Sequence, residues 1–354
     1  MAKNKIKKTD LYVLKEELGI KQFNAFPRDI SLDYNEKLNK LKMTLTQEAA
    51  CFLKKGKDYI NMQDNRACFE AWCLIIKAQT KTTIRGLEIE LDVEDINDSS
   101  YPSYRSGRPA NGHLGRFLYR ILKFSEQYKW FGLSNKLEKI KKKFKNYLDK
   151  HSFVTSAPSK KPKANIANCN LESYIEYLYC DSISAQKDIL KLPSGTAIDR
   201  QLPVSLFEGT KGKVTRVFTG VKSAIDFWAL DGDTINVYEL KSDNPMVGII
   251  TEIFFYSNYV YDVFISQSLD HGKGCVELED RTDRSYDKIK IGRKQVKGIM
   301  LSNRWHARLD DSTRDEIIKI MNDNSMPGAI QYEFVEYQIK KRNIKRYSTI
   351  TLTP

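Results

Sequence analysis

The sequence of 354 residues contains little cysteine and histidine and no long apolar run. Its six cysteines are unevenly spaced and include no Cys-x-x-Cys pair, which excludes the common zinc modules and favours reduced thiols. No stretch approaches the roughly 18–20 apolar residues that a membrane span needs. The basic N-terminus has no apolar core behind it, so no secretory signal is expected there. These absences predict a soluble, cytoplasmic protein that does not bind membranes.

Several enzyme signatures are missing as well. The chain has no Walker A loop, no GxGxxG or HExxH motif and no internal repeat. It does carry a formal net charge of +13 and a pI near 9.2, which favour a polyanionic partner without naming one. A hydrophobic content of 41% predicts a folded protein, and the length predicts two domains.

Residues 1–150 are expected to form a mostly α-helical domain. Apolar residues recur at helical spacing in four segments, namely 31–55, 64–80, 112–129 and 133–151. Lys142 and Lys143 lie in a lysine-rich run on the last segment, and Arg116 is interleaved with aromatic residues on the third. These three side chains are candidate contacts to nucleic-acid phosphates. Ordinary solvated helix surfaces are the alternative interpretation.

Residues 151–167 are small, basic and proline-containing, which is typical of a linker. The second domain, residues 168–354, is predicted to alternate helices and strands. Helices are expected at 171–179, 247–261 and 311–321, and strands or extended segments at 200–204, 213–218, 223–230, 234–240, 296–302 and 330–340.

The most informative stretch is residues 225–241, IDFWALDGDTINVYELK. Two runs of β-forming residues flank an Asp-Gly-Asp turn, which predicts a hairpin. Glu239 and Lys241 share a face because they are two residues apart on one strand. A two-residue loop at Asp231-Gly232 is expected to place Asp226 diagonal to Glu239 on that face. A four-residue loop is expected to place Asp226 directly opposite Glu239. A three-residue loop would separate the two carboxylates.

Two carboxylates and an ammonium are costly to bury without a partner. Mg²⁺ or Mn²⁺ would be such a partner, because hard divalent cations prefer oxygen ligands. The ion would activate water and neutralise charge on a phosphoryl group, while Lys241 oriented or deprotonated the water. An edge hairpin with a surface Glu–Lys pair is the alternative.

The pattern Ile225-Asp226 followed by Glu239-Leu240-Lys241 resembles the PD-(D/E)XK, or restriction-endonuclease-like, nuclease superfamily. The resemblance covers roughly residues 168–340, and only the metal motif is specific; the Pro before the Asp is absent. It implies an α/β C-terminal domain with a mixed central sheet flanked by helices. It also implies that Asp226, Glu239 and the Leu240 backbone carbonyl bind the metal and that Lys241 is catalytic.

The resemblance extends to residues outside the hairpin. Glu172 on the first helix is expected to complete the acidic cluster, with Glu176 as the alternative. Gln201 precedes the first strand and is expected to line the substrate side. Glu252 stands where many members have Gln, which leaves its role open.

These features predict a metal-dependent endonuclease whose expected substrate is DNA, acting in restriction, phage defence or repair. A catalytically idle nuclease-fold module that binds nucleic acid or a protein is the alternative. The N-terminal domain would supply target recognition or a partner contact, and a homodimer is compatible with either function.

Overall fold

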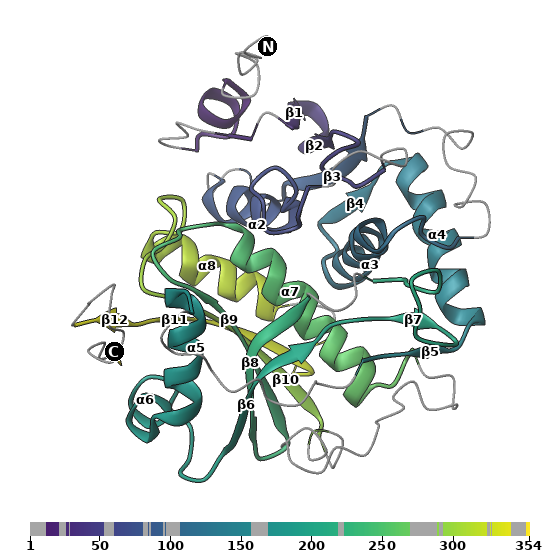
Figure 1. The fold of residues 1–354 in the computed structure, drawn as a ribbon. Coiled ribbons are helices and arrows are strands. Elements are labelled where there is room, and N and C mark those ends of the chain that lie inside the picture. The colour runs from purple at the N-terminus through teal and green to yellow at the C-terminus, as the bar shows by residue number, and fades with distance from the viewer. Residues whose placement is uncertain are drawn as a thin grey trace. The chain divides into compact units, whose positions relative to one another are not determined.

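The computed structural model describes residues 12–20, 26–27, 29–52, 60–80, 84, 86–94, 96, 107–156, 169–218, 223–269, 289, 293–323, 326, 328–340 and 352–354. The chain divides into two compact units. Unit 1 consists of residues 1–151 and 311–325, and unit 2 of residues 152–310 and 326–354 (Figure 1). The segment 311–325 therefore belongs to unit 1, although the sequence analysis assigned it to the second domain.

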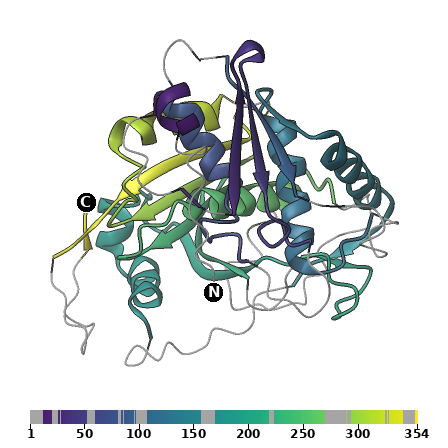
Figure 2. The ribbon, with the colours of Figure 1, turned by 90° about the horizontal axis from the view of Figure 1, so that it is seen from above.

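Unit 1 is an α/β unit with a four-stranded sheet in the order β1-β2-β3-β4 (Figures 1 and 2). The β1–β2 pair is antiparallel, and the β2–β3 and β3–β4 pairs are parallel. The elements of the unit are β1 (Ile30–Asn35), β2 (Lys40–Leu45), α2 (Phe69–Gln79), β3 (Glu88–Val93), α3 (Gly112–Gln127), β4 (Phe131–Leu133), α4 (Asn135–Lys150) and α8 (Asp311–Asn322), with helical turns at Val13–Glu17 and Glu36–Leu38.

The sheet corrects the prediction of a mostly α-helical domain. Residues 31–55 were expected to be helical, but their first part forms β1 and β2. In β2, Leu41, Met43 and Leu45 are buried and the residues between them are partly exposed, which is the two-residue period of a strand. The helices expected within 64–80, 112–129 and 133–151 are confirmed as α2, α3 and α4.

A buried ion pair joins the two central helices of unit 1. Arg120 of α3 donates hydrogen bonds to both carboxylate oxygens of Glu70 in α2, at 2.6 and 2.5 Å, and to the Ala67 carbonyl oxygen at 2.8 Å. Both charged side chains are almost fully buried, so each satisfies a group that would otherwise be costly to desolvate. The ring of Phe69 lies beneath the guanidinium, 5.0 Å from it.

Unit 2 is built on a five-stranded mixed sheet in the order β11-β10-β9-β8-β6. The pairs β6–β8 and β8–β9 are antiparallel, and the pairs β9–β10 and β10–β11 are parallel. The predicted mixed sheet with flanking helices is thus confirmed. The elements are β5 (Phe153–Val154), α5 (Leu171–Asp181), α6 (Ile183–Asp188), β6 (Ala197–Pro203), β7 (Phe207–Glu208), β8 (Ala224–Asp231), β9 (Thr234–Lys241), α7 (Gly248–Val260), a helical turn at Tyr261–Ile265, β10 (Gln295–Ser302), β11 (Ile330–Glu336), β12 (Gln338–Ile339) and β13 (Leu352–Thr353).

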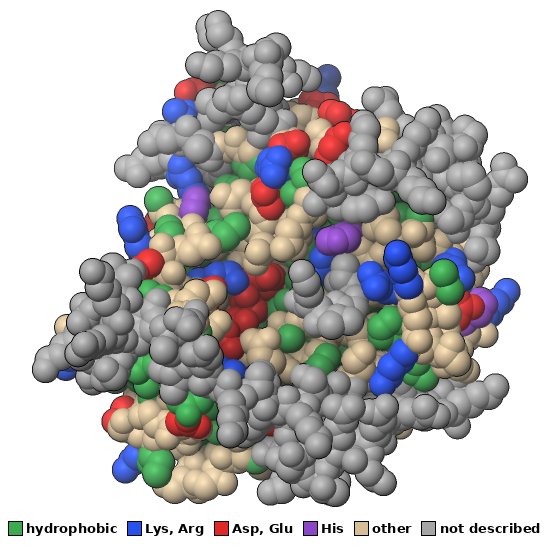
Figure 3. Space-filling view, viewed as in Figure 1, with side chains coloured by type: hydrophobic (Ala, Val, Ile, Leu, Met, Phe, Trp, Pro, Cys, Tyr) green, Lys and Arg blue, Asp and Glu red, His purple; other side chains and the backbone are tan. Residues whose placement is uncertain are grey.

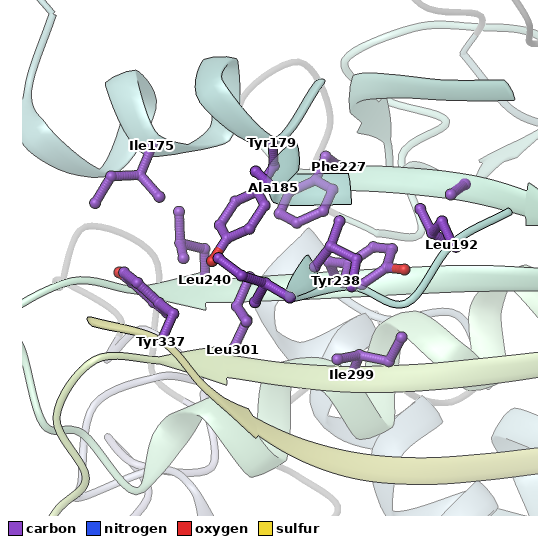
Figure 4. Packing of buried hydrophobic residues seen from close by; sticks show 13 residues of the cluster. Ile175, Tyr179, Ala185, Leu192, Phe227, Tyr238, Leu240, Ile299, Leu301 and Tyr337 are labelled. Atoms are coloured by element: carbon purple, nitrogen blue, oxygen red, sulfur yellow. The ribbon is translucent and has the colours of Figure 1, made fainter. Parts of the chain in front are cut away.

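Helices cover both faces of this sheet. On one face, Ile175 and Tyr179 of α5 join Leu240 of β9 in a buried apolar cluster (Figure 4). On the other face, α7 contacts β9 and β10. Gly298 of β10 permits that contact, because a Cβ at this position would overlap Ser257 Oγ and other side chains.

Two predicted boundaries are wrong. Residues 213–218 were expected to be extended, but they turn, with a single bridge between Arg216 and Phe207. Phe153 and Val154, placed in the predicted linker, pair with β7 instead, because both are apolar and Phe153 is buried. Most of the remaining linker, residues 157–167, lies outside the described residues.

Two negative expectations can be checked over the described part of the chain. Its five cysteines are free thiols, and Cys275 lies outside it. None of its helices is long and apolar enough to cross a membrane.

Gly298→Ala is expected to destabilise the protein by about 1–3 kcal/mol, because the added methyl group overpacks the contact between β10 and α7. Urea unfolding measures the loss. Gly132→Ala in β4 is the matched control: a Cβ there meets nothing within 4 Å, so its effect should be small. Equal stability of the two variants would contradict the close approach of α7.

Candidate active site

The hairpin of β8 and β9 forms as predicted. Its two-residue loop lies one residue further along the chain than the predicted loop at Asp231-Gly232. Asp231 pairs with Thr234, so the loop is Gly232-Asp233, and Gly232 adopts the positive φ (+56°) that tight hairpin loops require. Continuing this register toward the open end of the hairpin places Asp226 directly opposite Glu239. The two carboxylates therefore share one face of the sheet, as the sequence analysis required.

That face is the one covered by α7. Gly298, which contacts α7, pairs with Val237 of β9, and residues that pair across strands point to the same face. Glu239 and Lys241, two and four residues further along β9, consequently point toward α7. The Asp226 carboxylate also fixes the hairpin, because its Oδ2 accepts a hydrogen bond of 2.8 Å from the Leu240 backbone N–H.

Lys241 is held by two carboxylates. Its Nζ lies 2.5 Å from Glu239 Oε1 and 2.9 Å from Glu252 Oε2, and Glu252 comes from the second turn of α7. All three residues are at most 7% exposed, so these pairs form away from bulk water. Glu252, which the sequence analysis left without a role, is thus part of the site.

Two more carboxylates come from α5. Glu172 and Glu176 lie one turn apart, and the Ser242 backbone N–H donates to Glu172. Gln201 Nε2 donates a hydrogen bond of 2.8 Å to Glu176 Oε2. The backbone of Gln201 is unusual for a strand residue, since its φ is +55°. The β6–β8 register places Gln201 opposite Asp226. Acidic side chains gather at the centre of the face in Figure 3, where Figure 1 shows β9 and α7.

Burial and mutual repulsion raise the pKa values of these carboxylates. The Asp226 carboxylate is desolvated, although the residue as a whole is only half-buried. Because of this desolvation and of repulsion from Glu176, the pKa of Asp226 lies well above the ordinary range. Burial and the neighbouring Asp226 raise the pKa of Glu239 in the same way. Burial raises the pKa of Glu176 to about 7, against the hydrogen bond from Gln201. The pKa of Glu172 is raised by burial.

The pKa of Lys241 moves in the direction that keeps its charge. Burial alone would lower this pKa, but the adjacent carboxylates of Glu239 and Glu252 outweigh burial and hold it well above its usual range. Lys241 is therefore an ammonium at neutral pH, which donates hydrogen bonds and has no lone pair to accept a proton.

Three buried carboxylate oxygens, Glu172 Oε1, Glu239 Oε2 and Glu252 Oε2, accept no hydrogen bond from any described residue, although the last lies 2.9 Å from the Lys241 ammonium. Such atoms are rare, and an ion or water is the usual explanation. No group of three or more His, Cys, Asp or Glu side chains among the described residues is already arranged to hold a metal. The carboxylates of Glu239 and Glu252 instead contact the Lys241 ammonium.

The residues predicted to contact nucleic acid have different environments. Gln201 is exposed at the acidic cluster. Arg116 is buried in α3, and its Nη2 lies 3.0 Å from His113 Nδ1, which corrects the expectation that this side chain faces a partner. Its apolar neighbours draw that face of the helix into the core. Lys142 is exposed on α4 and Lys143 is half-buried, so only the former is fully presented to solvent.

Compared with known protein families, curated proteins and solved structures, the chain matches no family model, no protein and no structure.

Glu176→Gln is expected to stabilise the metal-free protein at neutral and alkaline pH. The folded-state pKa of about 7 exceeds the ordinary 4.5, so folding favours the protonated carboxyl, and wild-type stability falls as the pH rises between these values. The amide does not titrate, and the gain should approach roughly 3 kcal/mol at about pH 8 and vanish near pH 4.

Urea unfolding in EDTA across this pH range measures the effect. Glu333→Gln on β11 is the control. It removes a half-exposed carboxylate that pairs with Lys297 of β10, so it should change stability little. A Glu176→Gln protein that is less stable than wild type at every pH would contradict the electrostatic account.

Proposed function

We propose that this chain is a Mg²⁺- or Mn²⁺-dependent nuclease with a restriction-endonuclease-like C-terminal domain that hydrolyses phosphodiester bonds of DNA. The observation that carries the proposal is the register of the hairpin, which sets Asp226 opposite Glu239 with Lys241 on the same face. The order of the larger elements, α5, β6, β8, β9, α7 and β10, supports it, because the resembled family has a helix, three strands, a helix and a strand in that order; the short α6 and β7 lie between them.

Asp226 and Glu239 would hold the metal, and the Leu240 carbonyl would add a ligand. The unpaired Glu239 Oε2 supports this assignment, since a buried carboxylate oxygen without a hydrogen bond has its lone pairs available. A bound divalent cation would supply an activated water and neutralise negative charge on the phosphoryl group. Glu172, with its own unpaired oxygen, would complete the acidic cluster.

Lys241 would act as a charged hydrogen-bond donor. An ammonium with a raised pKa can orient a water molecule or stabilise an anionic phosphoryl oxygen, whereas proton abstraction would require the neutral amine. Glu252 holds the ammonium from α7, so its position does not depend on Glu239 alone. Unit 1 would supply further phosphate contacts through Lys142, which is exposed on α4.

A catalytically idle nuclease-fold module remains the second candidate. The observation in its favour is the ion pairing of Lys241, which engages one oxygen of Glu239. Such a module would bind nucleic acid or a protein and would not cleave.

Asp226→Asn and Glu239→Gln are expected to abolish metal-dependent cleavage of plasmid, linear duplex, single-stranded DNA or RNA. Lys241→Ala should reduce the cleavage rate by about 10²–10⁴-fold, the usual contribution of a positioned catalytic group. Asp231→Asn is the matched control, because this carboxylate lies on β8 at the hairpin loop and points to the other face.

Cleavage in Mg²⁺ or Mn²⁺ but not in EDTA, retained by Asp231→Asn, would support the nuclease and identify its substrate. Binding without cleavage, unaltered in the Asp226 and Glu239 variants, would instead favour the idle module. A protein that neither cleaves nor binds nucleic acid would refute the nuclease and would leave the idle module only as a protein-binding one.

A further inference from the structure

A second functional element follows from the parallel part of the unit 2 sheet. Strands β9, β10 and β11 run in the same direction, so their carboxyl ends meet at one edge. Ser302, the last residue of β10, pairs with Lys241 on one side and with Glu336 on the other. Neighbouring strands lie about 4.8 Å apart, so the segment that leaves β10 begins directly beside the catalytic lysine.

This segment, Asn303-Arg304-Trp305-His306, is anchored at both of its sides. Asn303 Nδ2 donates to Asp243 Oδ1, and the Asp243 backbone N–H donates to Asn303 Oδ1, each at 2.9 Å. The segment after β10 is thereby fastened to the segment after β9. The Ser302 hydroxyl also holds the backbone of Arg304, accepting from its N–H at 3.2 Å and donating to its carbonyl at 2.8 Å.

Trp305 anchors the other side. Its Nε1–H donates to Glu336 Oε2 at 2.9 Å, and its ring packs edge-on against Phe334 at 5.1 Å. Arg304 lies between these anchors and is exposed. Its guanidinium makes no hydrogen bond or ion pair with any residue that the structure describes. A rigid backbone therefore presents an uncommitted cation at the edge of the site.

The charge of the site makes such a cation useful. Five carboxyl groups accompany a single ammonium, and that ammonium is already paired twice, so the charge of Lys241 is not free to attract a phosphodiester to the site. An arginine suits the task of drawing the backbone in, because its planar fork binds phosphate oxygens bidentately and keeps its charge at all ordinary pH values.

We infer that Arg304 binds a backbone phosphate of the nucleic-acid substrate next to the scissile bond, and that the Asn303–Asp243 clasp positions it. The inference rests on the proposed nuclease function for its substrate class. Arg304 acts in binding and in placing the substrate, since Asp226, Glu239 and Lys241 supply the groups for the reaction.

The test compares Arg304→Ala, Arg304→Lys and Asn303→Ala with Lys294→Ala. Lys294 is the matched control, because its side chain is 76% exposed and it lies just before the other end of β10. At about 3.3 Å per residue, Lys294 is about 26 Å from Ser302 at the end of β10 that leads to Arg304. Binding of labelled duplex DNA, single-stranded DNA and RNA is measured without cleavage, in EDTA or Ca²⁺, at salt concentrations from about 50 to 200 mM. Cleavage kinetics in Mg²⁺ are measured separately.

Arg304→Ala is expected to weaken binding about tenfold, to raise KM with little change in kcat, and to reduce the slope of log affinity against log salt by about one. Arg304→Lys should restore the slope but only part of the affinity, since lysine lacks the bidentate fork. Asn303→Ala should weaken binding less and leave the slope unchanged, because the cation remains but its position is looser.

An Arg304→Ala protein that matches Lys294→Ala in affinity, salt slope and KM would overturn the inference while leaving the nuclease intact. If wild type binds without cleaving and Arg304→Ala still loses affinity, the nuclease proposal fails and the phosphate contact stands. A wild-type protein that binds no nucleic acid would refute the phosphate contact as well.

Discussion

Buried negative charge is the constraint on which the rest of unit 2 depends. Glu172, Glu176, Asp226, Glu239 and Glu252 come from four elements and meet one ammonium, Lys241. One positive charge balances at most one of them, so at neutral pH the remainder must take up protons or a cation. The raised pKa values of Glu172, Glu176, Asp226 and Glu239 are the first of these responses. Binding of a divalent ion would be the second. Protons and a metal ion would then compete for the same carboxylate oxygens.

The sheet makes this concentration of charge possible. Strand β9 is central, with β8 and β10 as neighbours and helices on both faces, so its side chains leave water whatever their polarity. One face of β9 joins the apolar cluster with α5, and this packing stabilises the strand. The other face can then hold Glu239 and Lys241 at an electrostatic cost that the fold tolerates. The parallel order of β9, β10 and β11 adds a second consequence, because it brings Arg304 to the same edge as Lys241.

The sequence predicted local patterns well and distant contacts poorly. The hairpin could be predicted because alternation and turn chemistry act over a few residues, even though its loop lies at Gly232-Asp233 rather than Asp231-Gly232. The strands of residues 31–45 were missed because their apolar residues fit a helical spacing as well as the two-residue period of a strand. The role of Glu252 could not be deduced, because its contact with Lys241 depends on how α7 packs against the sheet. Arg116 looked exposed because a charged side chain on an amphipathic helix usually is, and its burial depends on how α3 packs in unit 1.

The substitution of Glu for the expected Gln at position 252 has a physical rationale in this arrangement. A lone carboxylate partner at Glu239 would have to serve both the ammonium and a cation, and any shift of its side chain would release Lys241. Glu252 supplies a second anionic contact, 2.9 Å from Nζ, on an element that packs independently against β10. Its charge also adds to the repulsion that raises the pKa of Glu239. Glu252 therefore holds Lys241 more firmly, but it increases the need of the site for a counter-ion. A neutral glutamine would relax that demand and hold the ammonium less firmly.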